Sequence, residues 1–164
     1  MSVSIAVLTV SDTRSSDSDF SGKCITEILT AAGHIVNTKA IVKDEESDIQ
    51  YVIGKWLKEG FVDVIVVTGG TGPSIRDVTP NAIVPMFTSR MPGFGELFRQ
   101  LSYDEIGSAA MLSRADAGWI DQGLIRIPVF LLPGSPHAVR LAITALIEPQ
   151  LNHLMQICSQ EQKP

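Results

Sequence analysis

The segment from Val62 to Pro80 reads Val-Asp-Val-Ile-Val-Val-Thr-Gly-Gly-Thr-Gly-Pro-Ser-Ile-Arg-Asp-Val-Thr-Pro, and it indicates the fold class of the whole chain. Its β-branched first part, 62–67, is typical of a strand buried on both faces of a parallel sheet. The glycines that follow let backbone N–H groups approach a ligand closely. Arg76 and Asp77 come next, and a Thr-Pro pair then predicts a helix with threonine as its N-cap. The segment therefore predicts a phosphate-binding loop at the carboxyl end of a strand.

Two common phosphate-binding motifs are excluded by the residues after Gly70. A dinucleotide-binding fingerprint that starts there needs glycine at the position of Ile75. A P-loop needs Gly-Lys-Ser or Gly-Lys-Thr at the end of the glycine run, where Pro73 and Ser74 stand. For the glycines alone, a tight strand-to-helix turn without a ligand remains the alternative. The charged pair and the threonine that follow favour the phosphate site.

Composition indicates one globular domain. The chain has 164 residues, of which 45% are hydrophobic and 19% are charged. Its net charge of −5 argues against binding to nucleic acid or to an anionic membrane surface. Cys24 and Cys158 lie far apart without metal-ligand spacing and are expected to be reduced thiols. No signal peptide and no run of membrane-spanning length is expected, so the predicted location is cytoplasmic.

Strands and helices are predicted to alternate along the chain. The strands cover residues 3–10, 34–42, 62–68 and 128–132. Such alternation predicts an α/β fold, a three-layer α/β/α arrangement that is Rossmann-like with a mostly parallel sheet. A small β-hairpin, 115–120 with 123–127, is predicted on the side of the main sheet. We expect residues 1–158 to form a single domain and residues 159–164 to form a frayed tail.

Polar residues follow the ends of the predicted strands. Ser11 and Asp12 follow the first strand, Asp44 follows the second, and Gly134-Ser135 follow the last. Because the carboxyl ends of parallel strands meet at one edge of a sheet, these groups are expected to converge on the glycine loop. Two aspartates beside two phosphate-binding loops favour phosphoryl or nucleotidyl transfer, with the carboxylates holding Mg²⁺. For Asp44, favourable placement at a helix N-terminus is the alternative.

The glycine-loop segment is similar to the signature of the MoaB/MogA family, which works in molybdenum cofactor biosynthesis. Further stretches resemble the family in the same order, and the resemblance extends from Ile5 to about Leu154. These stretches are Thr9-Val10-Ser11-Asp12, Val42-Lys43-Asp44-Glu45, Pro92-Gly93-Phe94-Gly95-Glu96 and Leu132-Pro133-Gly134-Ser135-Pro136. The spacing from Met91 through Ile106 resembles the MoaB branch.

The resemblance implies Mg-ATP-dependent adenylylation of molybdopterin, with release of pyrophosphate, before molybdate insertion. It implies that Asp44 and Asp77 are the catalytic acids and the Mg²⁺ ligands. The substrate-binding residues that it implies are Ser11, Asp12, Ser21, Gly22, Gly69, Gly70, Thr71, Gly72, Arg76, Thr79, Ser113, Gly134 and Ser135. One departure is Asn81, where the family often has an acid.

Two alternatives stay open. Some MoaB-type members have lost the Arg-Asp-x-Thr pattern, so a non-catalytic molybdopterin-binding or carrier protein is one alternative. A mainly structural oligomer subunit is another. The resemblance also implies a homo-oligomer, a trimer or a dimer of trimers, and a molybdate-inserting enzyme as a possible partner. Plausible subunit contacts are Phe94, Phe98, Leu101 and Trp119.

Overall fold

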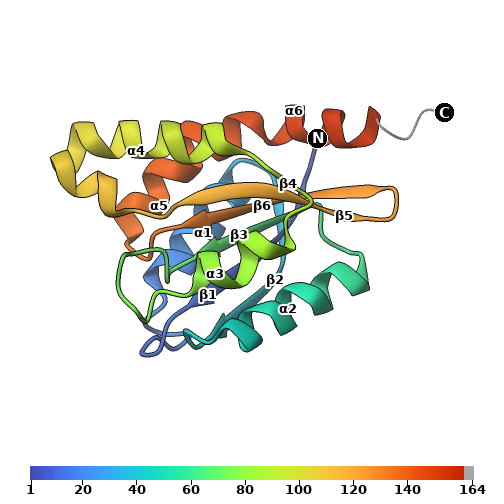
Figure 1. The fold of residues 1–164 in the computed structure, drawn as a ribbon. Helices are drawn as coiled ribbons and strands as arrows, with labels where there is room; N and C mark the ends of the chain where they lie inside the picture. Colours follow the sequence, from blue (N-terminus) through green and yellow to red (C-terminus); the bar gives the residue numbers. More distant parts are fainter. Residues whose placement is uncertain (161–164) are drawn as a thin grey trace.

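The structure, a computed structural model, describes residues 1–160, with side chains described through residue 158. Its centre is a six-stranded sheet with the strand order β2-β1-β3-β6-β5-β4 (Figure 1). The strands β2, β1, β3 and β6 run parallel, whereas β5 and β4 run antiparallel to their neighbours. The bounds are β1 Ser4–Val10, β2 Ile35–Val42, β3 Val64–Thr68, β4 Ser89–Arg90, β5 Asp116–Gln122 and β6 Ile125–Leu132.

Helices cover both faces of the sheet, as Figure 1 shows. One face carries α1 (Phe20–Ala31), α4 (Pro92–Ile106), α5 (Pro136–Ala142) and α6 (Glu148–Gln160). The other face carries α2 (Glu46–Glu59) and α3 (Thr79–Ile83). Short 3-10 segments follow α3 and α4, at Val84–Met86 and Gly107–Leu112, and a π-helical segment, Ile143–Ile147, joins α5 to α6. The predicted three-layer α/β/α fold is therefore confirmed.

The central strands are buried because their side chains alternate between two hydrophobic cores. In β3, Val64 and Val66 pack under the layer that contains α1, α4, α5 and α6. Ile65 and Val67 point to the opposite face and pack against α2 and α3. A period of two with apolar residues on both faces explains the unbroken β-branched run in the sequence. All five residues of β3 are buried, so the loop after Thr68 starts from a fixed point.

The predicted hairpin differs from the observed one. Residues 125–132 form one continuous strand, so the second arm of the hairpin and the last parallel strand are the same element. The turn lies at Gly123, which has φ of +63°, and not at Asp121 and Gln122. Consequently β5 is a full member of the main sheet, and it carries β4 at the sheet edge.

Two of the predicted subunit contacts are core residues. Phe94 and Phe98 are buried on α4, and their rings lie 6.3 Å apart in a stacked arrangement. Phe94 also meets Phe130 of β6 edge-on. These rings attach α4 to the sheet, so they are not available to another subunit.

Two further predictions concern the C-terminal tail and the absence of membrane-spanning segments. The backbone of α6 is helical through Gln160, and residues 161–164 of the predicted tail lie outside the described residues. The single-domain boundary therefore stays a prediction. Along residues 1–160, we find no helix with the length and apolar character needed to cross a bilayer.

Candidate functional site

A cavity of about 530 Å³ lies where β1, β3 and β6 end. Its floor is formed by the loops that follow these strands, and one wall comes from α4 and the 3-10 segment after it. The lining residues are Val10, Ser11, Thr13, Arg14, Asp44, Gly69, Gly70, Thr71, Gly72, Pro73, Asp77, Phe98, Ser102, Ile106, Ala110, Leu112, Ser113, Pro133, Gly134, Ser135 and Ala138. The cavity thus has a polar floor and an apolar wall.

The glycine loop, residues 69–72, is shaped by contacts that exclude larger side chains. Gly69 has φ of +98° and donates its N–H to Leu132 O at 3.0 Å, which ties the loop to the end of β6. A Cβ at this position would overlap with the carbonyl oxygen of Val10. Gly70 has φ of +66°, and a Cβ there would lie 2.9 Å from Asp44 Oδ1. Glycine is therefore required for the backbone to reach this position.

Five backbone amides at the two loops have no acceptor within the described part of the chain. They belong to Gly70, Thr71, Gly72, Gly134 and Ser135. The loops lie side by side, because Gly69 N donates to Leu132 O at 3.0 Å and Thr68 Oγ1 donates to Pro133 O at 2.8 Å. Consecutive unpaired N–H groups that line a concave surface form an anion-binding site. The two loops together therefore offer a single anion-binding floor.

Asp44 and Asp77 both line the cavity, and each packs against a glycine of the loop. Asp77 accepts a hydrogen bond from Ser74 N at 3.0 Å, and its Oδ2 would lie 2.7 Å from a Cβ on Gly72. The pKa of Asp44 is raised above its usual value, first by burial and then by the negative charges of Asp12 and Asp77. The positive charge of Arg76 offsets this only in part, so the two carboxylates form an acidic pair beside the glycine loop.

The acidic pair fits Mg²⁺. No group of three His, Cys, Asp or Glu side chains that could hold a metal occurs in the described chain. Mg²⁺ is usually bound by one or two carboxylates, water and substrate phosphates, without a complete cage of protein ligands. Asp44 and Asp77, next to an anion-binding floor, match that requirement.

Asp44→Asn is expected to stabilise the fold at neutral pH. In the folded state the carboxyl has a raised pKa, so its ionisation costs free energy that the neutral amide avoids. The advantage should shrink as the pH falls through the folded pKa and vanish below the ordinary value of 3.8, where the carboxyl is protonated in both states. Thermal unfolding of both proteins between pH 3 and pH 8 measures this, with Asp104→Asn, at an exposed position of α4, as the control. A variant that is less stable than the wild type at pH 7 would contradict it.

Arg76 does not line the cavity. Its guanidinium donates to Asp12 Oδ2 from Nε at 3.1 Å and from Nη2 at 2.8 Å, and it reaches Glu45 Oε1 at 3.4 Å. This contact lowers the pKa of Asp12 and raises that of Arg76. Asp12 Oδ1 in turn accepts from Asp44 N at 3.1 Å. Arg76 and Asp12 therefore join the glycine-loop segment to the ends of β1 and β2 and help to position Asp44.

Ten of the predicted site residues lie together around the cavity, and five lie beside it. The ten are Ser11, Asp44, Gly69, Gly70, Thr71, Gly72, Asp77, Ser113, Gly134 and Ser135, and the five are Asp12, Ser21, Gly22, Arg76 and Thr79. Buried Ser21 donates to Gly134 O at 2.6 Å, and Gly22 N donates to Asp19 Oδ1 at 2.9 Å. Thr79 is not the N-cap of α3, since Val78 is, and its hydroxyl donates to Gly69 O at 2.7 Å. The Ser21 hydroxyl therefore supports the loop at Gly134, and the Thr79 hydroxyl supports the glycine loop.

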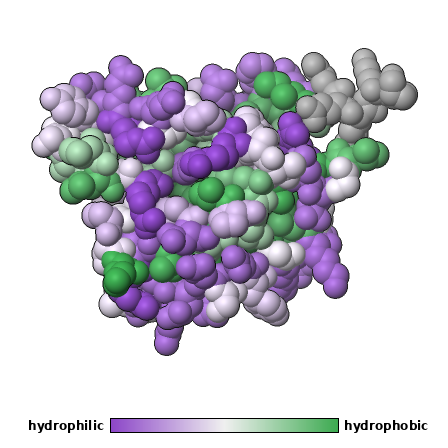
Figure 2. All heavy atoms as spheres, viewed as in Figure 1, coloured by the Kyte–Doolittle hydropathy of each residue, from purple (hydrophilic) through white to green (hydrophobic). Residues whose placement is uncertain are grey.

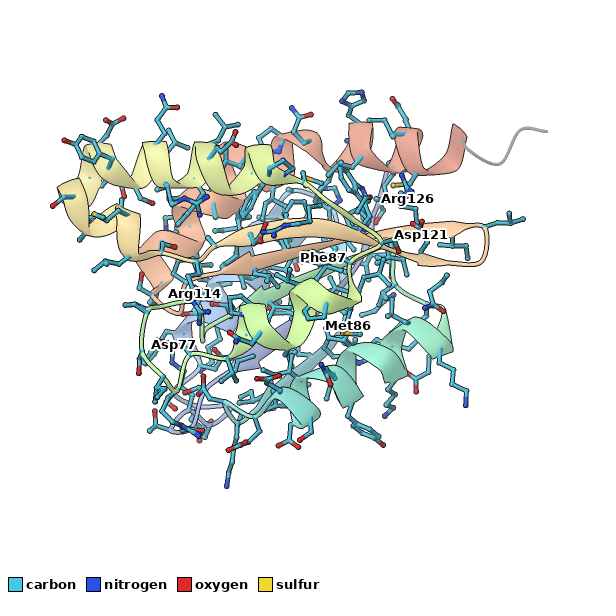
Figure 3. All side chains as sticks on the ribbon, in the orientation of Figure 1. Asp77, Met86, Phe87, Arg114, Asp121 and Arg126 are labelled. Atoms are coloured by element: carbon cyan, nitrogen blue, oxygen red, sulfur yellow. The ribbon has the colours of Figure 1, made fainter. Side chains whose placement is uncertain are left out.

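Sequence reasoning missed two arginines. Arg114 donates to Gly72 O and Asn81 Oδ1, each at 2.9 Å, and also to Asp77 O. Figure 3 shows Arg114 and Asp77 at the same end of the sheet. Arg14 lines the cavity directly. The partners of both arginines include residues far away in the sequence, so local pattern gave no signal for them. The apolar wall was missed for the same reason.

A second, open groove of about 760 Å³ lies on the face between α3 and α4. Figure 2 shows hydrophilic side chains around a more hydrophobic floor on this face. Val84, Pro85 and Met111 contribute the apolar part, whereas Arg90 pairs with Asp116. The groove has no glycine loop and no acidic pair. The first cavity is therefore the candidate functional site.

Comparison with known proteins relates this chain to molybdenum cofactor biosynthesis proteins. The family model described as "Probable molybdopterin binding domain" matches residues 6–153. Molybdenum cofactor biosynthesis protein B of Staphylococcus aureus (strain COL) is 49% identical over 156 residues, which cover 93% of this chain and 90% of that protein.

Two solved structures have the same fold over nearly their whole length. A crystal structure of molybdenum cofactor biosynthesis protein B has a TM-score of 0.92 and 43% identity, and the match covers 98% of each chain. The tungsten cofactor synthesizing protein MoaB from Pyrococcus furiosus has a TM-score of 0.85 and 35% identity, with 96% of this chain and 97% of that one covered. The chain therefore belongs to the MoaB/MogA family of molybdenum cofactor biosynthesis proteins.

Proposed function

We propose that this protein transfers the adenylyl group of ATP to the terminal phosphate of molybdopterin. An oxygen of that phosphate forms a bond to the α-phosphorus, the bond from the α-phosphorus to the bridging oxygen breaks, and pyrophosphate leaves. The observation that carries the proposal is the acidic pair, Asp44 and Asp77, beside five unpaired amides in one cavity. Phosphoryl chemistry depends mainly on positioning and charge neutralisation, and these groups supply both.

The anion-binding floor would hold and orient the phosphates. Amides of Gly70, Thr71 and Gly72 come from one loop, and those of Gly134 and Ser135 from the other. Each of the two reacting phosphate groups would therefore be bound by one loop, and the two loops lie next to each other. Because the loops are tied to β1, β3 and β6, their geometry is fixed before the substrates bind, and this preorganisation favours the transition state.

The acidic pair would hold Mg²⁺ between the protein and the phosphates. When bound, that ion shields the repulsion between the two phosphate groups and stabilises the leaving pyrophosphate. Asp77 is oriented by Ser74 N, and Asp44 by Asp12 and the glycine loop. The apolar wall from Phe98, Ile106 and Leu112 would contact a heterocyclic ring and limit the access of water.

A non-catalytic molybdopterin-binding or carrier protein is the second candidate. The intact glycine loops favour it as much as they favour the enzyme. The acidic pair does not, because two carboxylates beside a bound phosphate weaken binding unless a cation joins them. The acidic pair likewise does not favour a mainly structural oligomer subunit, which has no need of two carboxylates in a cavity. We further propose that the protein forms a homo-oligomer in the cytoplasm. A molybdate-inserting enzyme would be its partner.

The proposal is tested by incubating the protein with ATP, Mg²⁺ and molybdopterin and measuring pyrophosphate release together with the adenylylated pterin. We expect release only when all three are present, and loss of release when EDTA is added. Each single omission is a control. If molybdopterin binds in an equilibrium assay but no pyrophosphate forms, the protein is a binder or carrier and the proposal is wrong.

A further inference from the structure

We propose that Arg14 is the side chain that binds a phosphoryl group of the substrate in this cavity. This inference rests on the proposed function and names a residue that the family motifs above do not include. Arg14 lies in the loop after β1, and its side chain is 27% exposed. Among the described residues that line the cavity, it is the one with a cationic side chain.

The guanidinium of Arg14 is positioned at the point where the two phosphate loops meet. Its Nη2 donates to Gly134 O at 2.6 Å, and its Nη1 donates to Ser21 Oγ at 3.0 Å. A Cβ on Gly134 would lie 3.9 Å from Nη2 and 3.4 Å from the Cα of Gly69. Two anchors on different elements therefore fix the plane of the guanidinium beside the unpaired amides of Gly134 and Ser135.

The charge of Arg14 is not closely neutralised by the protein. Its acceptors are a hydroxyl and a carbonyl, and its contact with Asp19 is 4.0 Å long. Both oxygens of Asp19 already accept other hydrogen bonds, from Thr9 Oγ1 at 2.7 Å and Gly22 N at 2.9 Å. A guanidinium has more N–H groups than these two anchors use, and the rest face no acceptor in the described chain.

Four other arginines of the chain are engaged differently. Arg76, Arg90 and Arg126 each form an ion pair with an aspartate, with Asp12, Asp116 and Asp121 respectively. Arg114 donates to the outer side of the glycine loop and does not line the cavity. Arg14 thus combines exposure to the cavity with an available charge.

Electrostatics favours a phosphate at this position. The cavity contains the negative charges of Asp44 and Asp77, which would repel a phosphate monoester without a cation nearby. A guanidinium with free N–H groups matches the geometry of phosphate oxygens and can form paired, charge-assisted hydrogen bonds. The ligand chemistry is therefore a terminal phosphoryl group, held between the Arg14 guanidinium and the amides of Gly134 and Ser135.

Both substrates, the nucleotide and the pterin, carry a phosphoryl group. Equilibrium binding measurements can show which of the two Arg14 contacts. Affinities of wild type, Arg14→Gln and Arg14→Lys would be measured for AMP against adenosine and for molybdopterin against its dephosphorylated form. We expect Arg14→Gln to weaken one phosphorylated ligand about 10- to 100-fold without changing its dephosphorylated partner. Arg14→Lys should recover part of the loss, because it keeps the charge but not the planar fork.

Controls separate direct binding from loop support. Ser21→Ala removes one of the two anchors of Arg14 and a hydrogen bond to Gly134 O but leaves the Arg14 charge in place, so it should weaken the phosphorylated ligand less than Arg14→Gln does. Arg140→Gln removes a positive charge from an exposed position on α5 and should have no effect. Unfolding curves would show whether each variant is folded.

The inference is overturned if Arg14→Gln binds both phosphorylated ligands as tightly as the wild type does. It is also overturned if the variant loses affinity equally for phosphorylated and dephosphorylated ligands, because Arg14 would then act only on loop geometry. Either result leaves the proposed function intact. Failure of the wild type to bind AMP and molybdopterin would instead contradict the proposed function itself.

Discussion

Asp77→Asn is expected to reduce pyrophosphate release by about 100-fold or more while leaving the fold intact. The substitution removes a negative charge and little else. Asparagine can still accept the hydrogen bond that Ser74 N donates to Asp77 Oδ2, so the turn before α3 is kept. The loss would therefore come from the carboxylate that belongs to the acidic pair with Asp44.

Steady-state pyrophosphate release and thermal unfolding, measured on the same preparations, check this expectation. Asp104→Asn provides a matched control, because it removes an exposed acid on α4 outside the cavity lining. Asp77→Glu separates charge from position, since the longer side chain keeps the charge but displaces it from Gly72. Wild-type rates in Asp77→Asn would show that this carboxylate has no part in the reaction.

Gly69→Ala is expected to destabilise the folded protein by about 2 to 5 kcal/mol. Alanine rarely adopts φ near +98°, and its Cβ would overlap with the backbone carbonyl of Val10. Relief requires movement of the end of β1 or of the glycine loop, and both line the cavity. The melting temperature should fall by about 5 to 15 °C, and phosphate binding should weaken with it.

Gly54→Ala is the control for this measurement. Gly54 is an exposed residue of α2, and nothing lies within 4 Å of the position that its Cβ would take. Alanine is the better helix former by up to about 1 kcal/mol, so this variant should be at least as stable as the wild type. An unchanged melting temperature for Gly69→Ala would mean that the loop adjusts more easily than its contacts indicate.

Most of the fold could be predicted because its signals are local. The β-branched run before Thr68 and the glycines after it identify a buried strand and its loop, and the structure has both. The hairpin was placed wrongly for a reason that is also local. The apolar run 125–132 contains Pro128, which suggested a strand start, yet Pro128 lies within β6 opposite Trp119.

The site was harder to predict because its supports are contacts between distant parts of the chain. The strand ends brought Asp44 and Asp77 to one cavity as expected. By contrast, the partners of Arg76 and Arg114 depend on how loops fold back, and no spacing in the sequence encodes them. Threonine before proline suggested a helix cap, but Thr79 instead donates to Gly69 O, which requires a loop that only the fold supplies.

The contact between Gly69 and Gly134 also limits how the sequence of this chain can change. The two positions are 65 residues apart, but a Cβ on Gly134 would lie 3.4 Å from the Cα of Gly69, so a movement of Gly69 changes the space beside Gly134. A substitution that is tolerated at Gly134 alone would become harmful if Gly69 had already shifted. The two loops should therefore accept substitutions jointly, and a mutational library would have to vary both positions together to recover functional sequences.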